Sequence, residues 1–188
     1  MGLVPINLFA SFLVLATAFL AVFVESAFDL TRWLLGAQVD LLAPLMVYAA
    51  LACDLPTVLA LAIGGGLWFD SLSANPLGVT SLALLLPGLL MHLRRDLILR
   101  REVTAQIVLG LAASAAVPVL SVLLLLSQRL QPLLGWNTLG RGLLVTVAGG
   151  LLTPLIFQAI DAVTRSLSYR PANASGHRPD REIRRGRM

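Results

Sequence analysis

Long apolar runs that few charged residues interrupt are the feature that most constrains this 188-residue chain. The first run covers residues 3–24, about 33 Å of helix at 1.5 Å per residue, which is enough to cross the core of a bilayer. Inside lipid, backbone groups find partners only in helices or closed barrels, and these runs lack the alternation of barrel strands. The sequence therefore predicts an all-α polytopic membrane protein.

Composition excludes the other broad classes. Hydrophobic residues make up 57% of the chain and charged residues 13%, whereas a soluble domain is about half apolar and about a quarter charged. A disordered chain needs the opposite balance. All 14 basic residues are arginines, and they flank apolar runs rather than a polar domain with stacking aromatics, which argues against nucleic-acid binding.

The apolar runs predict six transmembrane helices, at residues 3–24, 41–53, 55–69, 79–93, 103–127 and 142–163. Together they form a membrane domain over residues 1–165, and residues 166–188 form a disordered basic tail. The second and third runs are either a tight hairpin or one long tilted helix broken at Asp54. The hairpin is favoured, because Asp54 followed by Pro56 is typical of a helix start. No basic residue precedes the first run, so we expect a retained span rather than a cleaved signal.

Arginine positions predict the orientation. Arg94, Arg95, Arg100 and Arg101 follow the fourth run, and seven more arginines lie between Arg165 and the end of the chain. Basic residues concentrate on the cytoplasmic side, so these four arginines are predicted topology determinants at the membrane surface, and the tail is predicted to be cytoplasmic. Six spans then place the N-terminus in the cytoplasm as well. Segments 25–40, 70–78 and 128–141 face outward, the first as an amphipathic interfacial connector.

Motifs for catalysis or cofactor binding are missing. The sequence has no HExxH, no GxSxG and no lysine for a phosphate loop. Cys53 is the single cysteine and there are two histidines, too few for a metal cage. We therefore predict no cofactor, no metal and no enzymatic activity.

Four polar residues lie in or next to apolar runs. Burial of a polar group in a membrane costs free energy, so each of them is a candidate functional residue. Asp70, Gln106, Gln158 and Asp161 appear few and scattered for a ligand pocket. Asp161 precedes Arg165 by four residues, which indicates a structural i,i+4 pair. Asp70 ends a glycine-rich helix, where it caps backbone amides, faces water or meets a cation of a partner.

Small residues recur four apart, as in Ala60 and Gly64 or Gly110 and Ser114. Such spacing lets helices approach closely where lipid supplies no hydrophobic drive. Gly64, Gly65 and Gly66 are the most suggestive group, since each glycine weakens a helix by about 1 kcal/mol and close backbone contact is the expected compensation. These small residues could serve either for helix packing within the chain or as a binding surface for a transmembrane helix of a partner.

Three segments carry a resemblance to a known family. They are VDLLAPLMVYAAL from Val39 to Leu51, GGGLWFDSLS from Gly64 to Ser73, and NPLG from Asn75 to Gly78. Their order resembles that of the rod shape-determining protein MreD family, over about residues 36–95. Val39 stands where the family often has proline.

The resemblance implies a non-catalytic scaffold in the inner membrane of a bacterium, within the machinery that elongates the cell wall and maintains rod shape. Such a scaffold binds the single-span protein MreC, and through the complex it is linked to the MreB filament and to the polymerase and transpeptidase that build lateral peptidoglycan. The implied partner-binding residues are Gly64, Gly65, Gly66, Asp70, Asn75, Pro76 and Gly78. The family fold is similar to that of the six-helix substrate-binding subunits of vitamin uptake transporters, which supplies the alternative function, and a membrane-embedded enzyme ranks third.

Overall fold

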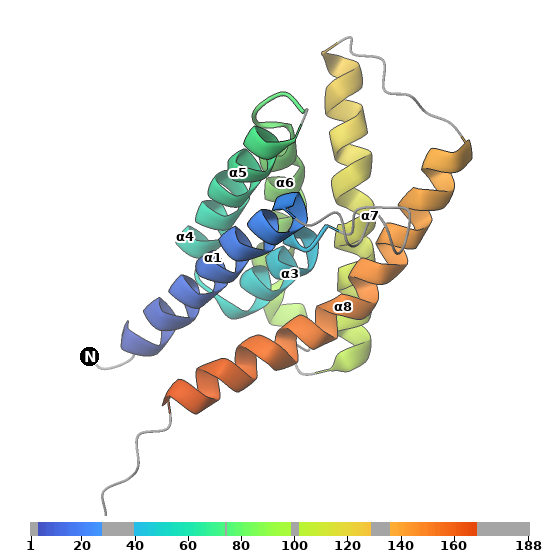
Figure 1. Cartoon of the computed structure of the whole chain (residues 1–188). Coiled ribbons are helices and arrows are strands. Elements are labelled where there is room, and N and C mark those ends of the chain that lie inside the picture. Colours follow the sequence, from blue (N-terminus) through green and yellow to red (C-terminus); the bar gives the residue numbers. More distant parts are fainter. Residues whose placement is uncertain (1–3, 28–39, 74, 99–101, 129–135, 169–188) are drawn as a thin grey trace, which may run out of the picture.

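The computed structural model describes residues 4–27, 40–73, 75–98, 102–128 and 136–168, and these contain helices and no strand. The all-α prediction is confirmed for this part of the chain. The helices, shown in Figure 1, are α1 (Val4–Ala27), α3 (Leu42–Ala52), α4 (Leu55–Ala60), the π-helical η1 (Leu61–Gly65), α5 (Gly66–Leu72), α6 (Val79–Leu93), the short 3-10 helix η2 (Arg95–Leu97), α7 (Val103–Ser127) and α8 (Trp136–Ser168).

Helix α3 and the helix that follows it form the expected hairpin. The chain leaves helical geometry at Cys53 and Asp54, and Pro56 lies in the first turn of α4. Segments α4, η1 and α5 continue directly into one another as one helix from Leu55 to Leu72. A β-carbon added to Gly65 would lie 3.2 Å from Cδ2 of Leu42. The start of α3 therefore lies beside the far part of the second helix, as in an antiparallel pair.

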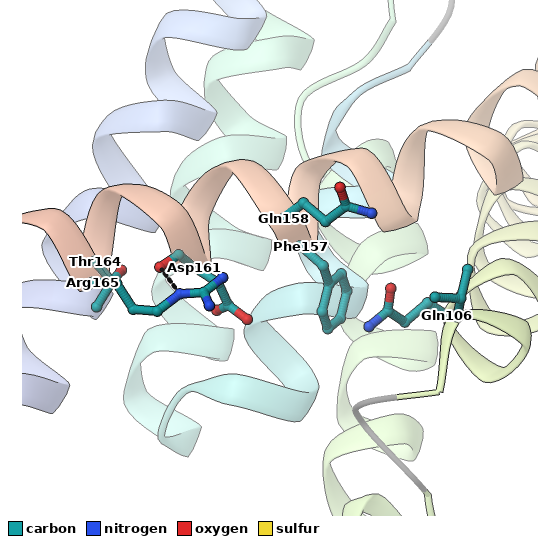
Figure 2. Close-up of a pocket in the computed structure, with 7 residues that line it drawn as sticks. Gln106, Phe157, Gln158, Asp161, Thr164 and Arg165 are labelled. Atoms are coloured by element: carbon teal, nitrogen blue, oxygen red, sulfur yellow. Dashed lines mark hydrogen bonds between the residues drawn. The ribbon is translucent and has the colours of Figure 1, made fainter.

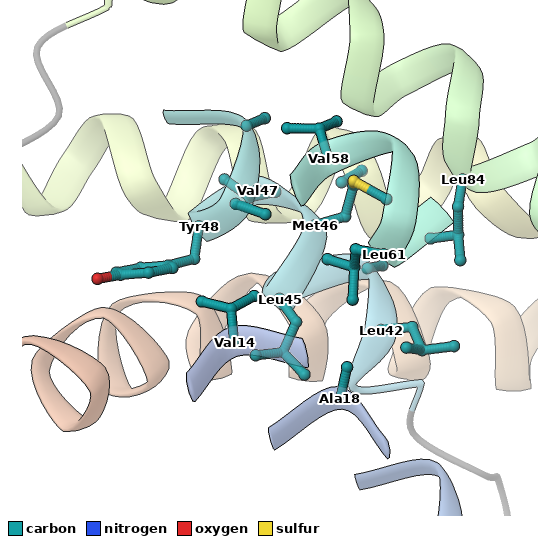
Figure 3. Packing of buried hydrophobic residues seen from close by; sticks show 14 of the residues in the cluster. Val14, Ala18, Leu42, Leu45, Met46, Val47, Tyr48, Val58, Leu61 and Leu84 are labelled. Carbon is teal, nitrogen blue, oxygen red and sulfur yellow. The ribbon is translucent and has the colours of Figure 1, made fainter. Parts of the chain in front are cut away.

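The core is built around α3. All ten residues from Leu42 to Leu51 are buried, and α3 contacts α1, α6, α7 and α8. Figure 3 shows Leu45, Met46 and Val47 of this helix among side chains of the neighbouring elements. A helix that is apolar on every side is stable only when it is surrounded, which explains why the shortest predicted run lies at the centre.

Three helices are long and apolar enough to cross a membrane: Leu55–Leu72, Val103–Ser127 and Gly142–Ser166. Shorter apolar stretches occur at Ala10–Ser26, in α3 and in α6. Large apolar side chains also point outward from several helices, among them Phe12, Leu82, Val108 and Leu155. In water such a surface is unfavourable, whereas lipid solvates it, so the helices form a membrane-embedded bundle.

Glycines bring α7 and α8 into close contact. A β-carbon on Gly110 would overlap the side chain of Thr153, and one on Gly149 would overlap that of Ser114. Gly150 lies against Leu111 in the same way. The predicted small-residue motif at Gly110 and Ser114 thus packs inside the chain, where close approach compensates for the missing hydrophobic drive in lipid.

Several sequence predictions fall outside the described residues. These are the body of the connector at 28–39, Arg100, Arg101, and the tail beyond residue 168, which includes nearly all of the predicted disordered segment.

Candidate functional site: a groove beside the glycine-rich helix

A small apolar groove lies between α1 and the helix that carries the three glycines. Its volume is about 240 Å³, and its lining residues are Leu15, Ala18, Phe19, Ala60, Leu61, Gly64, Gly65 and Trp68. The rings of Phe19 and Trp68 contact each other in a tilted arrangement, with centroids 4.5 Å apart and an interplanar angle of 31°. The lining of the groove thus combines aromatic rings with small residues.

The three glycines, predicted as one partner-binding set, have three different surroundings. A β-carbon on Gly64 would meet nothing within 4 Å, and this residue is exposed. One on Gly65 would contact Leu42 and Leu61, while one on Gly66 would lie 2.5 Å from the Cα of Ser81 on α6. Gly66 therefore permits close packing of α5 on α6, and Gly64 leaves open space at the surface.

The indole of Trp68 adds a polar feature to this apolar groove. Its Nε1 is buried and has no acceptor in the part of the chain that the structure describes. A buried N–H donor without a partner costs about 1–3 kcal/mol. This buried donor therefore belongs to one of the aromatic residues that line the groove.

Asp70 serves its own chain as a cap. Its side chain is 2% exposed, and Oδ2 accepts hydrogen bonds from the backbone N–H groups of Gly78 at 2.8 Å and Thr80 at 3.1 Å. Gly78 has a φ of +96°, in the left-handed region that favours glycine. Of the three roles considered for Asp70, the structure shows capping, which fixes the turn between α5 and α6.

The other predicted partner residues lie in that turn. Asn75, Pro76 and Gly78 are half-buried, and the backbone N–H of Asn75 lies 3.4 Å from Oγ of Ser73. Leu77, at the tip, is 70% exposed. The predicted set is therefore divided between the middle of the glycine-rich helix and the turn at its end, and a short stretch of α5 connects the two parts.

A second, more polar cavity lies between α7 and α8. Its volume is about 660 Å³, and its lining residues are Val103, Gln106, Phe157, Gln158, Asp161, Thr164 and Arg165. Figure 2 shows Gln106 on α7 and, along α8, the side chains of Phe157, Gln158, Asp161, Thr164 and Arg165. Three of the four polar residues judged scattered in the sequence therefore come together, and Asp70 lies elsewhere. Sequence spacing could not reveal this, because α7 and α8 meet only through tertiary packing.

The carboxylate of Asp161 is anchored from the core. The hydroxyl of Tyr48 on α3 donates to Oδ1 of Asp161 at 2.9 Å, and the Tyr48 ring packs edge-on against Phe157. Arg165, the predicted i,i+4 partner, donates from Nε to the backbone carbonyl of Asp161 at 3.1 Å. The contact that the structure shows between these two residues is thus a helix-backbone hydrogen bond.

Two further carboxylates close the start of α3, a feature that the sequence did not indicate. Oε1 of Glu25 accepts the N–H of Leu41 at 2.7 Å, and Oδ1 of Asp40 accepts that of Leu42 at 2.8 Å. Glu25 lies just beyond the first predicted span and is 7% exposed. Burial, with a smaller contribution from Asp40, raises the pKa of Glu25 from 4.5 to about 8.

Two of the predicted topology arginines are described. Arg94 and Arg95 are exposed after the end of α6, and Nη1 of Arg95 lies 3.4 Å from the carbonyl oxygen of Cys53. This contact links the start of the basic loop to the bend of the α3–α4 hairpin. Both features therefore lie at the same end of the bundle.

Metal-binding groups do not cluster in the described ranges: no three His, Cys, Asp or Glu side chains gather where an ion would fit. No protein-family model, curated protein or solved structure matches the chain. The resemblance to the MreD family therefore rests on the motifs between residues 36 and 95.

Proposed function

We propose that this protein is a non-catalytic scaffold of the bacterial cell-wall elongation machinery, which crosses the inner membrane six times and binds the transmembrane helix of MreC. The observation that carries the proposal is the apolar groove beside Gly64. Through MreC the scaffold is linked to MreB and to the elongation polymerase and transpeptidase. Its contribution to rod shape is to hold these components together in the membrane.

The groove has the features that a transmembrane helix needs in order to dock. Ala60 and Gly64 are both exposed and lie one helical turn apart, so they present a small-residue face on which a second backbone can approach closely. The volume of about 240 Å³ admits side chains of a partner helix rather than the helix itself.

The turn after α5 supplies a second contact at the membrane surface. Because Asp70 fixes the backbone at Gly78 and Thr80, the exposed side chain of Leu77 is held in a defined position. We place Asp70 as the residue that shapes this turn, rather than as a charge that meets the partner. Asn75, Pro76 and Gly78 form the turn itself.

The polar cavity between α7 and α8 favours one alternative, a substrate-binding subunit of a vitamin-type uptake transporter. Its volume of about 660 Å³ is that of a small-molecule site. In the predicted orientation, however, the end of α8 that carries Arg165 faces the cytoplasm. A subunit that captures nutrients from outside needs its site at the opposite surface, so the scaffold is the better reading.

The test is mild-detergent affinity purification of the tagged chain from its own cells, comparing wild type with Gly64→Leu. Because a β-carbon at Gly64 meets nothing within 4 Å, the leucine is tolerated by the fold but fills the groove. Recovery of MreC is expected to fall roughly tenfold, which corresponds to about 1.4 kcal/mol. Ala112→Leu, on an exposed position of α7, is the matched control and should leave recovery unchanged.

Two results would overturn the proposal. Unchanged MreC recovery with Gly64→Leu would remove the groove as the docking site. Recovery of an ATPase pair with a coupling membrane protein, in place of MreC and the wall-building enzymes, would identify a transporter subunit instead.

A further inference from the structure

We infer that the face of the bundle formed by α6 and the helix Leu55–Leu72 contacts a locally thinned bilayer and therefore selects phospholipids with short acyl chains. We call it the short face; its exposed apolar side chains include Ile63, Leu67, Leu82, Leu86 and Leu90. The inference rests on the six-span arrangement of the proposed function, in which both of these helices cross the membrane.

The two helices of the short face are shorter than α7 and α8. The helix Leu55–Leu72 has 18 residues, which extend about 27 Å, and the 15 residues of α6 extend about 22 Å. The apolar stretches of α7 and α8 have 25 residues each, about 37 Å. A bilayer core is roughly 30 Å thick, so the short face is too low by roughly 3–8 Å.

Tilting corrects an excess of length but not a deficit. A helix longer than the bilayer core reduces its height by tilting, and Figure 1 shows α8 inclined across α7. Tilting a helix that is already too short lowers its height further. The lipid must therefore adapt to the short face, whereas α7 and α8 can adapt to the lipid.

Polar residues mark the boundary of the short face at the hairpin bend. Asp54 is exposed before α4, and Arg94 and Arg95 are exposed after α6. Nη1 of Arg95 lies 3.4 Å from the carbonyl oxygen of Cys53, so these residues lie at one level of the bundle. An arginine reaches the headgroup layer along its flexible stem, but the side chain of Asp54 is too short to do so. The headgroup layer must therefore approach Asp54, because an acidic group is costly in hydrocarbon.

The opposite boundary is fixed by the turn between α5 and α6. The carboxylate of Asp70 accepts the backbone N–H of Gly78 at 2.8 Å, which closes this turn directly before α6 begins at Val79. Between the two boundaries, Leu82, Leu86 and Leu90 follow one another at four-residue spacing and are each more than half exposed. Such a stripe is solvated by acyl chains, and its limited height sets the chain length that fits.

The experiment compares Leu86→Trp with Leu155→Trp, each in the full chain with the three native tryptophans replaced by phenylalanine. Leu86 lies at the middle of α6 and Leu155 near the middle of the apolar stretch of α8, and their side chains are 56% and 58% exposed. Each variant is reconstituted in vesicles that contain a brominated phosphatidylcholine with 18-carbon chains and an unbrominated one with chains of 14, 18 or 22 carbons. Quenching of the tryptophan fluorescence reports which lipid is bound beside it.

At Leu86→Trp, we expect the 14-carbon lipid to displace the quencher about threefold more effectively than the 22-carbon lipid, because mismatch costs a fraction of a kcal/mol per Å. Leu155→Trp should show little dependence on chain length. Leu82→Trp and Leu151→Trp, also at exposed positions of α6 and α8, repeat the comparison, and melting temperatures verify that the variants are folded.

The same chain-length dependence on α6 and α8 would overturn the inference. Absence of quenching at Leu86→Trp and Leu82→Trp with every lipid would also overturn it, because protein rather than lipid would then cover the short face. Normal recovery of MreC without chain-length selectivity would refute the short face alone, and selectivity without recovery of MreC would refute the scaffold alone. Cysteine labelling that places both ends of α6 on one side of the membrane would refute the six spans together with this inference.

Discussion

The protonation of Glu25 depends on the fold. This residue joins the end of α1 to the start of α3 by accepting the N–H of Leu41, and its Oε2 is buried with no donor in the described part of the chain. Among the described residues, the titratable group that acts on it is Asp40. Burial also raises the pKa of Asp40, so two carboxyls that resist ionisation close this end of α3.

The contribution of Glu25 to the free energy of unfolding should therefore fall as pH rises. The pKa of Glu25 is about 8 in the folded protein against an ordinary 4.5, so its contribution is complete below pH 4.5 and is lost as pH rises to 8. Glu25→Gln keeps an acceptor for Leu41 but cannot ionise. We expect its melting temperature to exceed that of wild type at pH 8.5 and the difference to vanish near pH 4.5.

The matched control for this experiment is Glu102→Gln. Glu102 is an exposed residue at the start of α7 and makes no side-chain capping bond, so its replacement should leave the pH profile of the melting temperature unchanged. Parallel profiles for wild type and Glu25→Gln would contradict the prediction.

Asp70 lies before α6 in the chain and Asp54 lies before α4, but we predict that only Asp70 stabilises the helix that follows it. Asp70 holds two backbone N–H groups at the start of α6, whereas exposed Asp54 makes no side-chain cap bond at the start of α4. Asp70→Asn places an amide where two donors converge, so we expect a loss of about 1–3 kcal/mol, seen as a lower melting temperature in detergent. Asp54→Asn should be neutral, and equal effects of the two variants would refute the capping role.

At the scale of elements, the sequence predicted well what depends on neighbouring residues. The hairpin break at Asp54 is marked by Pro56 in the first turn of α4, although Asp54 makes no side-chain cap bond, and the start of α6 at Val79 is marked by the left-handed Gly78 before it. The bounds of α7 agree with the predicted run from 103 to 127 because long apolar periodic segments are the strongest sequence signal. The π-helical stretch Leu61–Gly65 carried no such signal, although successive glycines weaken the α-helical alternative there.

The sequence could not predict which residues far apart in the chain come together in the folded protein. Nothing local distinguishes Gly64, which faces open space, from Gly66, which packs on Ser81. Likewise, Gln106 and Asp161 are 55 positions apart and meet at one cavity because glycines draw α7 and α8 together. Candidate sites in a chain this apolar thus depend on which helix faces become buried, and that is decided by the packing of the whole bundle.

For the whole molecule, the proposed six-span arrangement places the partner groove and the polar cavity between α7 and α8 in different helix pairs. Helix α6 is an element of this topology that can be tested directly. Its 15 residues extend only about 22 Å, less than the roughly 30 Å of a bilayer core. It can cross only if the membrane thins locally or if flanking residues enter the headgroup layer. Leu77 and Arg94 flank α6 at opposite ends and are both exposed, so they report directly on whether it crosses.

Single-cysteine labelling at these two positions tests the topology. In a Cys53→Ala background, Leu77→Cys should react with a membrane-impermeant maleimide in intact spheroplasts, because the turn faces outward. Arg94→Cys should react only after permeabilisation, since the positive-inside tendency keeps the basic loop in the cytoplasm. Equal labelling of both positions in intact spheroplasts would show that α6 does not cross, and the reverse pattern would invert the orientation. In the inverted case the polar cavity between α7 and α8 would open toward the outer surface. An uptake subunit could then bind its substrate there, and orientation would no longer favour the scaffold over the transporter subunit.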